Sequence, residues 1–195
     1  SQNCIQCNQC SFVCPHSVIR PFLLNQEEYD CAPEYVKTRC IKPIEKNLSD
    51  YYYIIGVSVK DCTGCGLCMK TCPGKAGEKA LIPMDFDLEI KNHEQEIADY
   101  LFNNVAYKEL VNVNTVKGSQ FKEPKFEFHG ACAGCGETGY IRLLTQLFGD
   151  KMIIANATGC SSIYGASVPS MPYRIPWASS LFEDNAEYGY GMLVA

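Results

Sequence analysis

A cysteine motif that occurs twice constrains this chain more than any other feature. Four cysteines with the spacing Cys-x2-Cys-x2-Cys-x3-Cys-Pro recur 58 positions later with the same spacing and the same following proline. The two copies consist of Cys4, Cys7, Cys10 and Cys14, and of Cys62, Cys65, Cys68 and Cys72. Because all four positions shift together, the copies are an internal repeat. Thiolates at this spacing on a tight loop can hold one face of a four-iron cluster.

The spacing predicts two 4Fe–4S clusters that are held jointly by the two copies. The three closely spaced cysteines of one copy would hold one cluster, and the cysteine before proline would hold the other. The predicted ligands are Cys4, Cys7, Cys10 and Cys72 for cluster one, and Cys62, Cys65, Cys68 and Cys14 for cluster two. Zinc is the alternative, but zinc sites typically use two Cys-x2-Cys pairs. The motif resembles that of bacterial two-cluster ferredoxins, which implies an α+β ferredoxin-like domain over residues 1–84.

Composition and charge exclude several other classes of protein. Thirteen cysteines would also suit a secreted disulfide scaffold, but such scaffolds are usually short, with an even number of cysteines. A reducing cytoplasm is therefore expected. The net charge of −5 argues against a nucleic-acid partner. The lack of an apolar run of about 18 residues argues against a membrane span. Since the sequence opens on Ser1 without methionine or signal peptide, we expect a segment of a longer polypeptide.

Residues 22–60 form an insert between the two copies. Its segment 51–59 is rich in aromatic and β-branched residues and predicts a strand. Residues 18–21 and 80–83 are apolar pieces that end in proline, and we expect them to be short strands that shield the clusters. The insert also holds two cysteines outside any ligand spacing, which we interpret as packed thiols, with ligands or a redox pair as the alternatives. They are Cys31 and Cys40.

Residues 85–125 are predicted to be a helix followed by a linker. Asn92 is the expected N-cap of the helix. One buried apolar stripe is predicted at four-residue steps by Ile97, Leu101 and Val105. Residues 112–125 are polar and broken by glycine and proline, so they predict a connection to a second domain.

Residues 126–195 are predicted to be part of an α/β parallel-sheet domain. Residues 138–148 predict a helix that stops at Gly149. Its expected apolar face consists of Ile141, Leu144 and Phe148. A buried strand is predicted next, at 152–155. In parallel sheets, ligands bind beyond the carboxyl ends of the strands, so a cofactor is expected near residues 158–162.

Three further cysteines in this region predict a third cluster. Cys132 and Cys135 are separated by two residues, and Cys160 follows the predicted strand. A cluster held by cysteines takes four of them, so the fourth ligand is expected outside this chain. The alternative is that these cysteines are structural thiols.

Several runs in the last third resemble the pyruvate:ferredoxin (or flavodoxin) oxidoreductases. These runs are residues 130–137 (GACAGCGE), 143–150 (LLTQLFGD) and 153–162 (IIANATGCSS), extended by 177–178 and 180–187. The duplicated ferredoxin motif directly upstream agrees with that family. The resemblance implies that residues 126–195 are the N-terminal part of a thiamine diphosphate-binding domain.

The resemblance also implies an activity and a set of cofactors. The activity is oxidative decarboxylation of pyruvate with coenzyme A to acetyl-CoA and CO2, with electrons passed through three 4Fe–4S clusters to ferredoxin or flavodoxin. The cofactors are the clusters, thiamine diphosphate and Mg2+, and the assembly is a homodimer. By position, Cys132, Cys135 and Cys160 would hold the cluster nearest thiamine, and Glu137 and Cys160 would contact thiamine diphosphate. No residue of this chain is assigned as catalytic.

The chain departs from the family pattern in three respects. Residues 173–176 stand where the family has a longer Gly-rich loop, the Gly-Asp-Gly diphosphate signature is absent, and so is the pyruvate-binding domain. This segment alone is therefore expected neither to bind thiamine tightly nor to turn over. The alternatives are a stand-alone electron-transfer ferredoxin module without chemistry of its own, and a related oxidoreductase for another 2-oxo acid.

Overall fold

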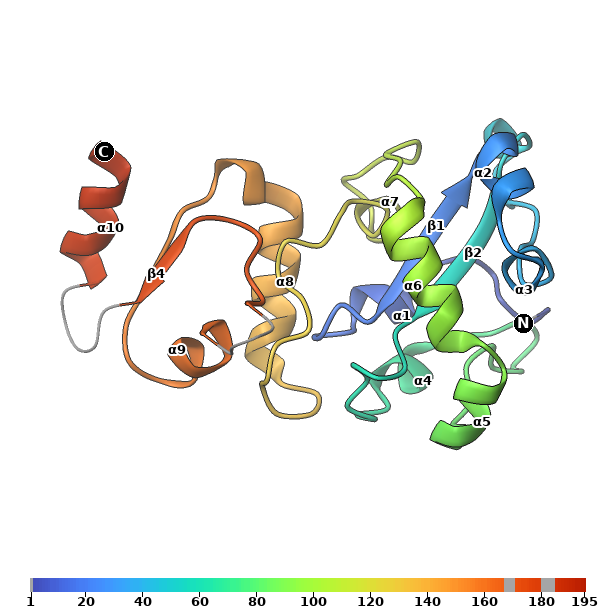
Figure 1. The fold of residues 1–195 in the computed structure, drawn as a ribbon, viewed down its shortest axis with the longest axis horizontal. Helices are drawn as coiled ribbons and strands as arrows, with labels where there is room; N and C mark the ends of the chain where they lie inside the picture. Colours follow the sequence, from blue (N-terminus) through green and yellow to red (C-terminus); the bar gives the residue numbers. More distant parts are fainter. Residues whose placement is uncertain (1, 167–170, 180–184) are drawn as a thin grey trace. The chain divides into compact units, whose positions relative to one another are not determined.

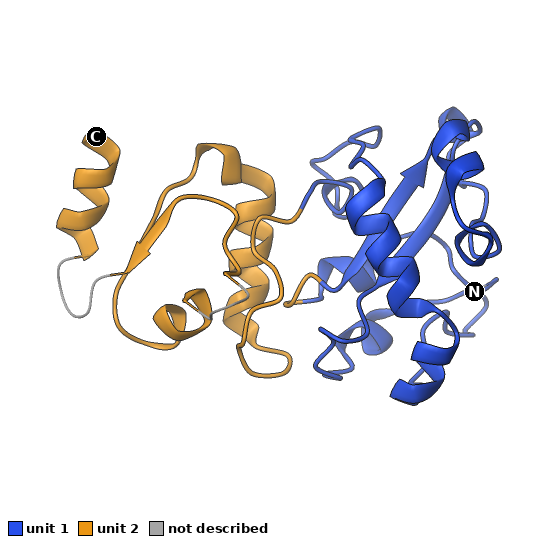
Figure 2. Ribbon diagram, in the orientation of Figure 1, with its two compact units in different colours: residues 1–14, 18–123 blue, residues 15–17, 124–195 orange. Residues whose placement is uncertain are grey.

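The computed structural model describes residues 2–166, 171–179 and 185–195. The chain is an α+β protein with small sheets (Figure 1). It divides into two compact units, of which unit 1 contains residues 1–14 and 18–123, and unit 2 contains residues 15–17 and 124–195 (Figure 2). None of the helices in the described ranges combines the length and apolar character needed to cross a membrane. Residues 180–184, part of one run that carries the family resemblance, lie outside the described residues.

Unit 1 is built from a two-stranded sheet and short helices. Its strands are β1 (Ile19–Leu24) and β2 (Tyr52–Val57). Its helices are α1 (Gln9–Phe12), α2 (Gln26–Cys31), α3 (Glu34–Lys37), the 3-10 turn η1 (Lys46–Leu48), α4 (Leu67–Thr71), α5 (Phe86–Lys91), α6 (Glu94–Asn104) and α7 (Val116–Ser119).

The sheet of unit 1 is antiparallel and joins the first motif to the insert. Ile19 pairs with Val57 and Leu24 with Tyr52, and every residue of β1 is buried. The strands predicted near 18–21 and 51–59 are thereby confirmed. The strand predicted at 80–83 is wrong, because these residues are irregular and Ile82 is 63% exposed. The two copies differ here because the insert supplies a partner strand for the first copy.

Helix α6 packs along β2 (Figure 1). The predicted stripe of Ile97, Leu101 and Val105 is buried, as expected. A Cβ at Gly56 of β2 would lie 3.0 Å from Leu101 Cδ1, so the glycine permits the close approach. The predicted N-cap is wrong, since Asn92 is instead the C-cap of α5 and α6 begins at Glu94. The chain turns between α5 and α6, so Asn92 ends α5, whereas the prediction placed it at the start of α6.

The segment predicted as a polar linker is packed over much of its length. It contains α7. Phe121 is buried in a cluster with Leu23, Leu48 and Tyr53. The buried Gln120 accepts a 3.0 Å hydrogen bond from Ser11 Oγ through its Oε1 atom. These contacts place residues 112–123 in unit 1, and the division between the units falls at 123–124.

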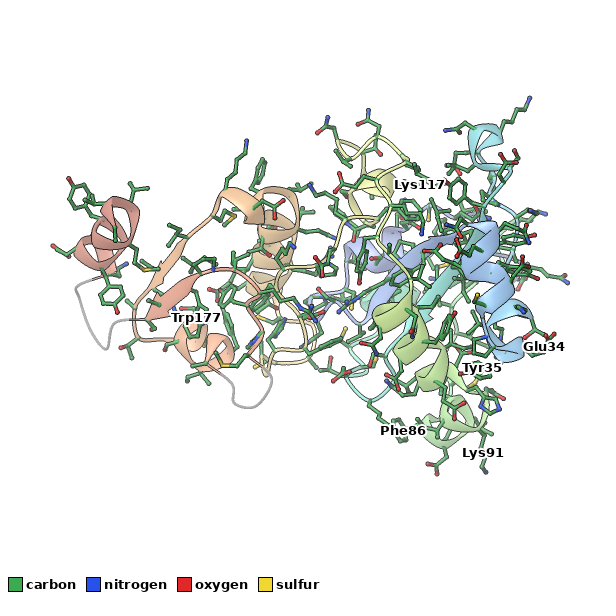
Figure 3. The ribbon with its side chains drawn as sticks, turned by 45° about the horizontal axis from the view of Figure 1, so that its top comes forward. Glu34, Tyr35, Phe86, Lys91, Lys117 and Trp177 are labelled. Atoms are coloured by element: carbon green, nitrogen blue, oxygen red, sulfur yellow. The ribbon has the colours of Figure 1, made fainter. Side chains whose placement is uncertain are left out.

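Unit 2 combines a two-stranded parallel sheet with helices. The elements are α8 (Gly136–Phe148), the 3-10 turn η2 (Gly149–Lys151), β3 (Ile154–Asn156), α9 (Cys160–Gly165), β4 (Trp177–Ser179) and α10 (Asn185–Val194). Strand β3 pairs in parallel with β4 from Ile154–Trp177 to Asn156–Ser179. The core is formed by Phe126, Tyr164 and Tyr173, with Trp177 packed against it (Figure 3).

The predicted helix of unit 2 is confirmed, but its expected apolar face is not the buried one. Helix α8 ends at Gly149 as predicted. Of the three predicted residues, Ile141 packs against the core of unit 2 as expected. Leu144 and Phe148 are more than half exposed, whereas Arg142 and Thr145 are buried. The strand predicted as buried is short and half-buried, because the described sheet has two strands and they leave its residues partly uncovered.

Candidate metal centre

The first cysteine motif lies on a loop that leads into α1. Cys10 and Cys14 are buried, and Cys4 and Cys7 are half-buried. The loop is fastened by two buried side chains between the cysteines. Gln6 donates to the Lys42 carbonyl oxygen at 2.8 Å, and Asn8 Oδ1 accepts from Tyr53 Oη at 2.7 Å. Both residues have positive φ angles, which lets the loop coil tightly.

The structure brings the thiols of the two copies together. Burial, with added repulsion from Cys4, Cys7 and Cys68, raises the pKa of the Cys10 thiol to about 12. Burial also raises the pKa of Cys62, and Cys14 and Cys65 add to the effect. The pKa of Cys68 rises through burial and through Cys14, Cys62 and Cys65.

This grouping agrees with a cluster two held by Cys62, Cys65, Cys68 and Cys14. Among the predicted ligands of cluster one, Cys4, Cys7 and Cys10 lie near one another. The fourth, Cys72, is the C-cap residue of α4, and α4 packs against α1. Neighbouring thiolates that repel one another are stabilised by a cation, and the iron of a cluster would supply that charge.

The grouped cysteines do not surround a single point. Among the described residues, no three His, Cys, Asp or Glu side chains converge tightly enough to hold one metal ion. A zinc ion needs four ligands around one point, whereas a four-iron cluster takes one cysteine at each iron. Ligands of a cluster can therefore be spread farther apart. All thirteen cysteines are free thiols.

The second group of cysteines lies in unit 2. Cys132 and Cys135 are on a turn closed by a 3.0 Å hydrogen bond from Cys135 N to Cys132 O, directly before α8. The backbone N–H of Thr138 lowers the pKa of the Cys135 thiol, with help from the Thr138 hydroxyl and the N–H of Glu137. Donors at the start of a helix therefore favour the thiolate, which is the form that ligates iron.

Cys160 and Glu137 are placed by two helices that meet at one end. Cys160 is the first residue of α9, beyond the carboxyl end of β3, where the sequence predicted a ligand. Tyr164, one turn later on α9, donates a 3.0 Å hydrogen bond from Oη to Glu137 Oε1 in the first turn of α8. Residues four apart share a helix face, so Cys160 is on the side of α9 that faces the start of α8.

A pair of histidines that the sequence analysis did not single out lies beside these cysteines. His16 and His129 stack with ring centroids 4.4 Å apart, and both are buried. His129 Nε2 lies 2.7 Å from the Pro15 carbonyl oxygen, and Phe128 N donates to His16 O at 3.0 Å. These bonds form a histidine clasp between residues 15–17 and 126–129. No motif spacing joins residues 113 positions apart, so sequence could not reveal the clasp.

The two cysteines of the insert lie outside the predicted ligand motifs and have different surroundings. Cys31 is exposed at the end of α2, and Cys40 packs against the core of unit 1. Burial raises the pKa of Cys40 to about 11, which disfavours a reactive thiolate. Cys40 agrees with the interpretation as a packed thiol, whereas that interpretation is wrong for Cys31, which is exposed.

Comparison with known proteins shows what the chain is similar to. It is 52% identical over 203 aligned residues to pyruvate:ferredoxin oxidoreductase of Moorella thermoacetica, and 50% identical over 200 to pyruvate-flavodoxin oxidoreductase of Klebsiella pneumoniae. The alignments cover 100% and 99% of this chain. Over its whole length, the chain is homologous to one segment of the pyruvate:ferredoxin and pyruvate-flavodoxin oxidoreductases.

The oxidoreductase relatives are much longer than this chain. The chain spans 17% of the Moorella protein and 16% of the Klebsiella protein. A third relative, pyruvate dehydrogenase (NADP+) of Cryptosporidium parvum, is 50% identical over 198 residues, which are 98% of this chain and 10% of the relative. No protein-family model matches the chain.

Proposed function

We propose that this chain is the electron-transferring segment of an enzyme that oxidises pyruvate with coenzyme A to acetyl-CoA and CO2. The observation that carries the proposal is the identity of about half of all positions, along the entire chain, to oxidoreductases named for pyruvate. The grouped thiols of unit 1, and Cys132 and Cys135 on one turn of unit 2, support it. One-electron steps need carriers such as iron–sulfur clusters.

Eleven cysteines would hold three 4Fe–4S clusters. Cluster one takes Cys4, Cys7, Cys10 and Cys72, cluster two takes Cys62, Cys65, Cys68 and Cys14, and the third takes Cys132, Cys135 and Cys160 with a ligand from elsewhere in the polypeptide. The clusters supply one-electron acceptors when bound. The chain's own residues bury the ligands, as at Cys10 and Cys14, or stabilise the thiolate, as Thr138 does at Cys135.

Thiamine diphosphate, held with Mg2+, would bind beside the third cluster in the N-terminal part of its domain, residues 126–195. When bound, it supplies the carbanion equivalent that attacks the 2-carbonyl of pyruvate. This chain contributes the Glu137 carboxylate at the start of α8 and Cys160 at the start of α9, which directly follows β3. This placement agrees with the rule that ligands bind beyond the carboxyl ends of parallel strands.

The electrons would leave through the ferredoxin-like clusters of residues 1–84 to ferredoxin or flavodoxin. One relative with 50% identity is instead named for NADP+, so we assign the choice of final acceptor to parts of the polypeptide beyond this segment. The proposal includes a cytoplasmic homodimer, which the family resemblance implies.

Iron analysis of the full-length enzyme tests the proposal. We expect about twelve irons per chain, and about eight in Cys135→Ala, because one four-iron cluster is lost. Cys31→Ser is the matched control and should keep about twelve. The intact enzyme should also reduce ferredoxin or flavodoxin only when pyruvate and coenzyme A are present.

Two results would favour another function. About eight irons in the unmodified enzyme would indicate an electron carrier without the third cluster. Faster reduction with a different 2-oxo acid than with pyruvate would indicate a related oxidoreductase.

A further inference from the structure

A buried tyrosine in unit 2 holds an exposed carboxylate. Tyr164 is 2% exposed, and its Oη lies 3.0 Å from Oε1 of Glu137, which is at the surface. A surface glutamate is ordinarily solvated and loses little by moving, so a fixed position needs a cause. Here a donor from the core of unit 2 supplies it.

The ring of Tyr164 has little freedom to move. It packs edge-to-face on Phe126 with centroids 5.8 Å apart, and it lies 5.9 Å from His129. At the next residue, a Cβ on Gly165 would be 3.0 Å from the Tyr173 ring, so α9 packs closely against that ring. The hydroxyl is therefore a fixed point on a rigid core.

The bond has a defined donor and acceptor. Burial raises the pKa of Tyr164, and the bond to Glu137 raises it as well, so the phenol keeps its proton and donates. A carboxylate has two oxygens, and in the described part of the chain no residue bonds Oε2 of Glu137. Tyr164 thus holds one oxygen of the carboxylate, and the other makes no hydrogen bond to a described residue.

An acidic residue in the first turn of α8 could also serve only to balance the helix dipole. That role requires no partner, and it would not need a buried hydroxyl aimed at one carboxylate oxygen. The dipole therefore does not account for Tyr164.

We propose that Tyr164 is a positioning residue that fixes the Glu137 carboxylate for thiamine diphosphate. The inference rests on the proposed function, because it gives Glu137 its ligand. Tyr164 is also one helical turn after Cys160, and Glu137 is two residues after Cys135. A single hydrogen bond thereby links the two segments that carry the third group of cysteines.

The test uses the full-length enzyme stripped of thiamine diphosphate, with the dissociation constant for thiamine diphosphate measured by calorimetry. Tyr164→Phe keeps the ring and removes the donor, and we expect affinity to fall about tenfold, since a bond to a charged group is lost. Glu137→Gln should lose at least as much. In the double variant the two losses should not add, because Tyr164 acts through Glu137.

Tyr173→Phe is the matched control. It removes a hydroxyl from the same aromatic core. Glu137 acts on that hydroxyl only through its charge and, among the described residues, does not accept a hydrogen bond from it, so affinity should stay within about twofold of wild type. Iron content and the cluster EPR spectrum should be unchanged in Tyr164→Phe. Those two readouts separate positioning from a general loss of packing.

Three results would overturn the inference. Wild-type affinity in Tyr164→Phe, with reduced affinity in Glu137→Gln, would reject Tyr164 while leaving the proposed function intact. Wild-type affinity in Glu137→Gln would reject both this role and the assignment of Glu137 to thiamine diphosphate. Equal losses in Tyr164→Phe and Tyr173→Phe, accompanied by loss of iron, would show that the tyrosine only packs the core.

Discussion

Two glycines follow the second cysteine motif, and both have a left-handed backbone conformation. Gly74 has φ 62° and Gly77 has φ 87°. Their surroundings differ, since a Cβ at Gly74 would lie 1.9 Å from the Glu78 carbonyl oxygen, whereas a Cβ at Gly77 would meet nothing within 4 Å. Gly74 is also two residues after Cys72, a proposed ligand of cluster one.

We predict that Gly74→Ala destabilises the loop by about 3 kcal/mol, from left-handed strain plus a backbone clash. Gly77→Ala introduces the left-handed backbone strain without a clash, so it should destabilise the loop by about 1 kcal/mol. Iron content and cluster EPR of the full-length enzyme measure the effect at Cys72. Equal iron content in both variants would contradict the prediction.

We also predict, for single residues, that the stability of the histidine clasp depends on pH. Burial lowers the pKa of His129 from 6.5 to about 4. The folded state therefore prefers the neutral ring, so the stabilising effect is complete above pH 6.5 and is lost as the pH falls toward 4. Between pH 7 and 5.5, protection of the Phe128 amide against hydrogen exchange should fall up to about tenfold.

His129→Gln removes the titrating group and keeps a side-chain donor. In this variant, the protection of the Phe128 amide against hydrogen exchange should therefore change much less with pH. His93→Gln replaces a histidine whose side chain is 52% exposed and serves as the control, with the wild-type pH dependence. Exchange in the full-length enzyme, corrected for the intrinsic effect of pH, gives the comparison. The same slope in all three proteins would rule out His129 as its source.

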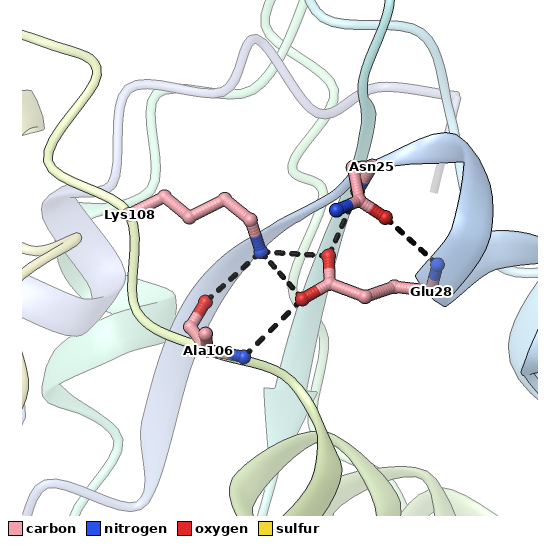
Figure 4. A network of polar contacts seen from close by, with 4 residues as sticks. All are labelled: Asn25, Glu28, Ala106 and Lys108. Atoms are coloured by element: carbon pink, nitrogen blue, oxygen red, sulfur yellow. Dashed lines mark hydrogen bonds and ion pairs between the residues drawn. The ribbon is translucent and has the colours of Figure 1, made fainter.

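At the scale of elements, helix α2 is anchored to a distant segment through one carboxylate (Figure 4). Asn25 Oδ1 accepts from Glu28 N, and Asn25 N donates to Glu28 Oε2, both at 2.8 Å. The same carboxylate accepts from Lys108 Nζ at 2.7 and 2.6 Å. Both charged side chains are less than one-fifth exposed, so water screens the pair only partly.

Glu28→Gln should therefore destabilise unit 1 by about 1–2 kcal/mol, because the charge-assisted bonds to Lys108 are lost. Glu27→Gln, on the exposed side of the same helix turn, should change stability by less than about 0.5 kcal/mol. Hydrogen exchange at residues 106–108 of the full-length enzyme reports the difference. Similar exchange in the two variants would show that the network contributes little.

Elements also show how far the sequence could predict this structure. Strand β2 and helix α6 follow from local periodicity, and the grouping of Cys14 with the second copy follows from the ligand pattern. The strand predicted at residues 80–83 is wrong, because a strand needs a partner strand and the local sequence does not show whether one is present. Gln6, Asn8 and His129 carried no local signal, because their bonds join segments far apart in the chain.

At the scale of the whole molecule, both units leave large apolar side chains exposed. In unit 2, α8 exposes Tyr140, Leu144 and Phe148, and α10 exposes Tyr190 and Leu193. Exposed apolar residues at four-residue steps along one helix, as on α8, are typical of surfaces that another part of a protein covers. The relatives, of which this segment is about one-sixth, contain such additional chain.

The membership of residues 15–17 in unit 2 has a consequence for synthesis on the ribosome. His16 emerges early, but its partner His129 follows 113 positions later. At about 5–20 residues per second, that delay is roughly 6–23 s. During this interval residues 15–17, next to Cys14, cannot form their contacts with residues 126–129. Unit 2 is therefore complete only when a late part of the chain packs against a segment that was synthesised much earlier.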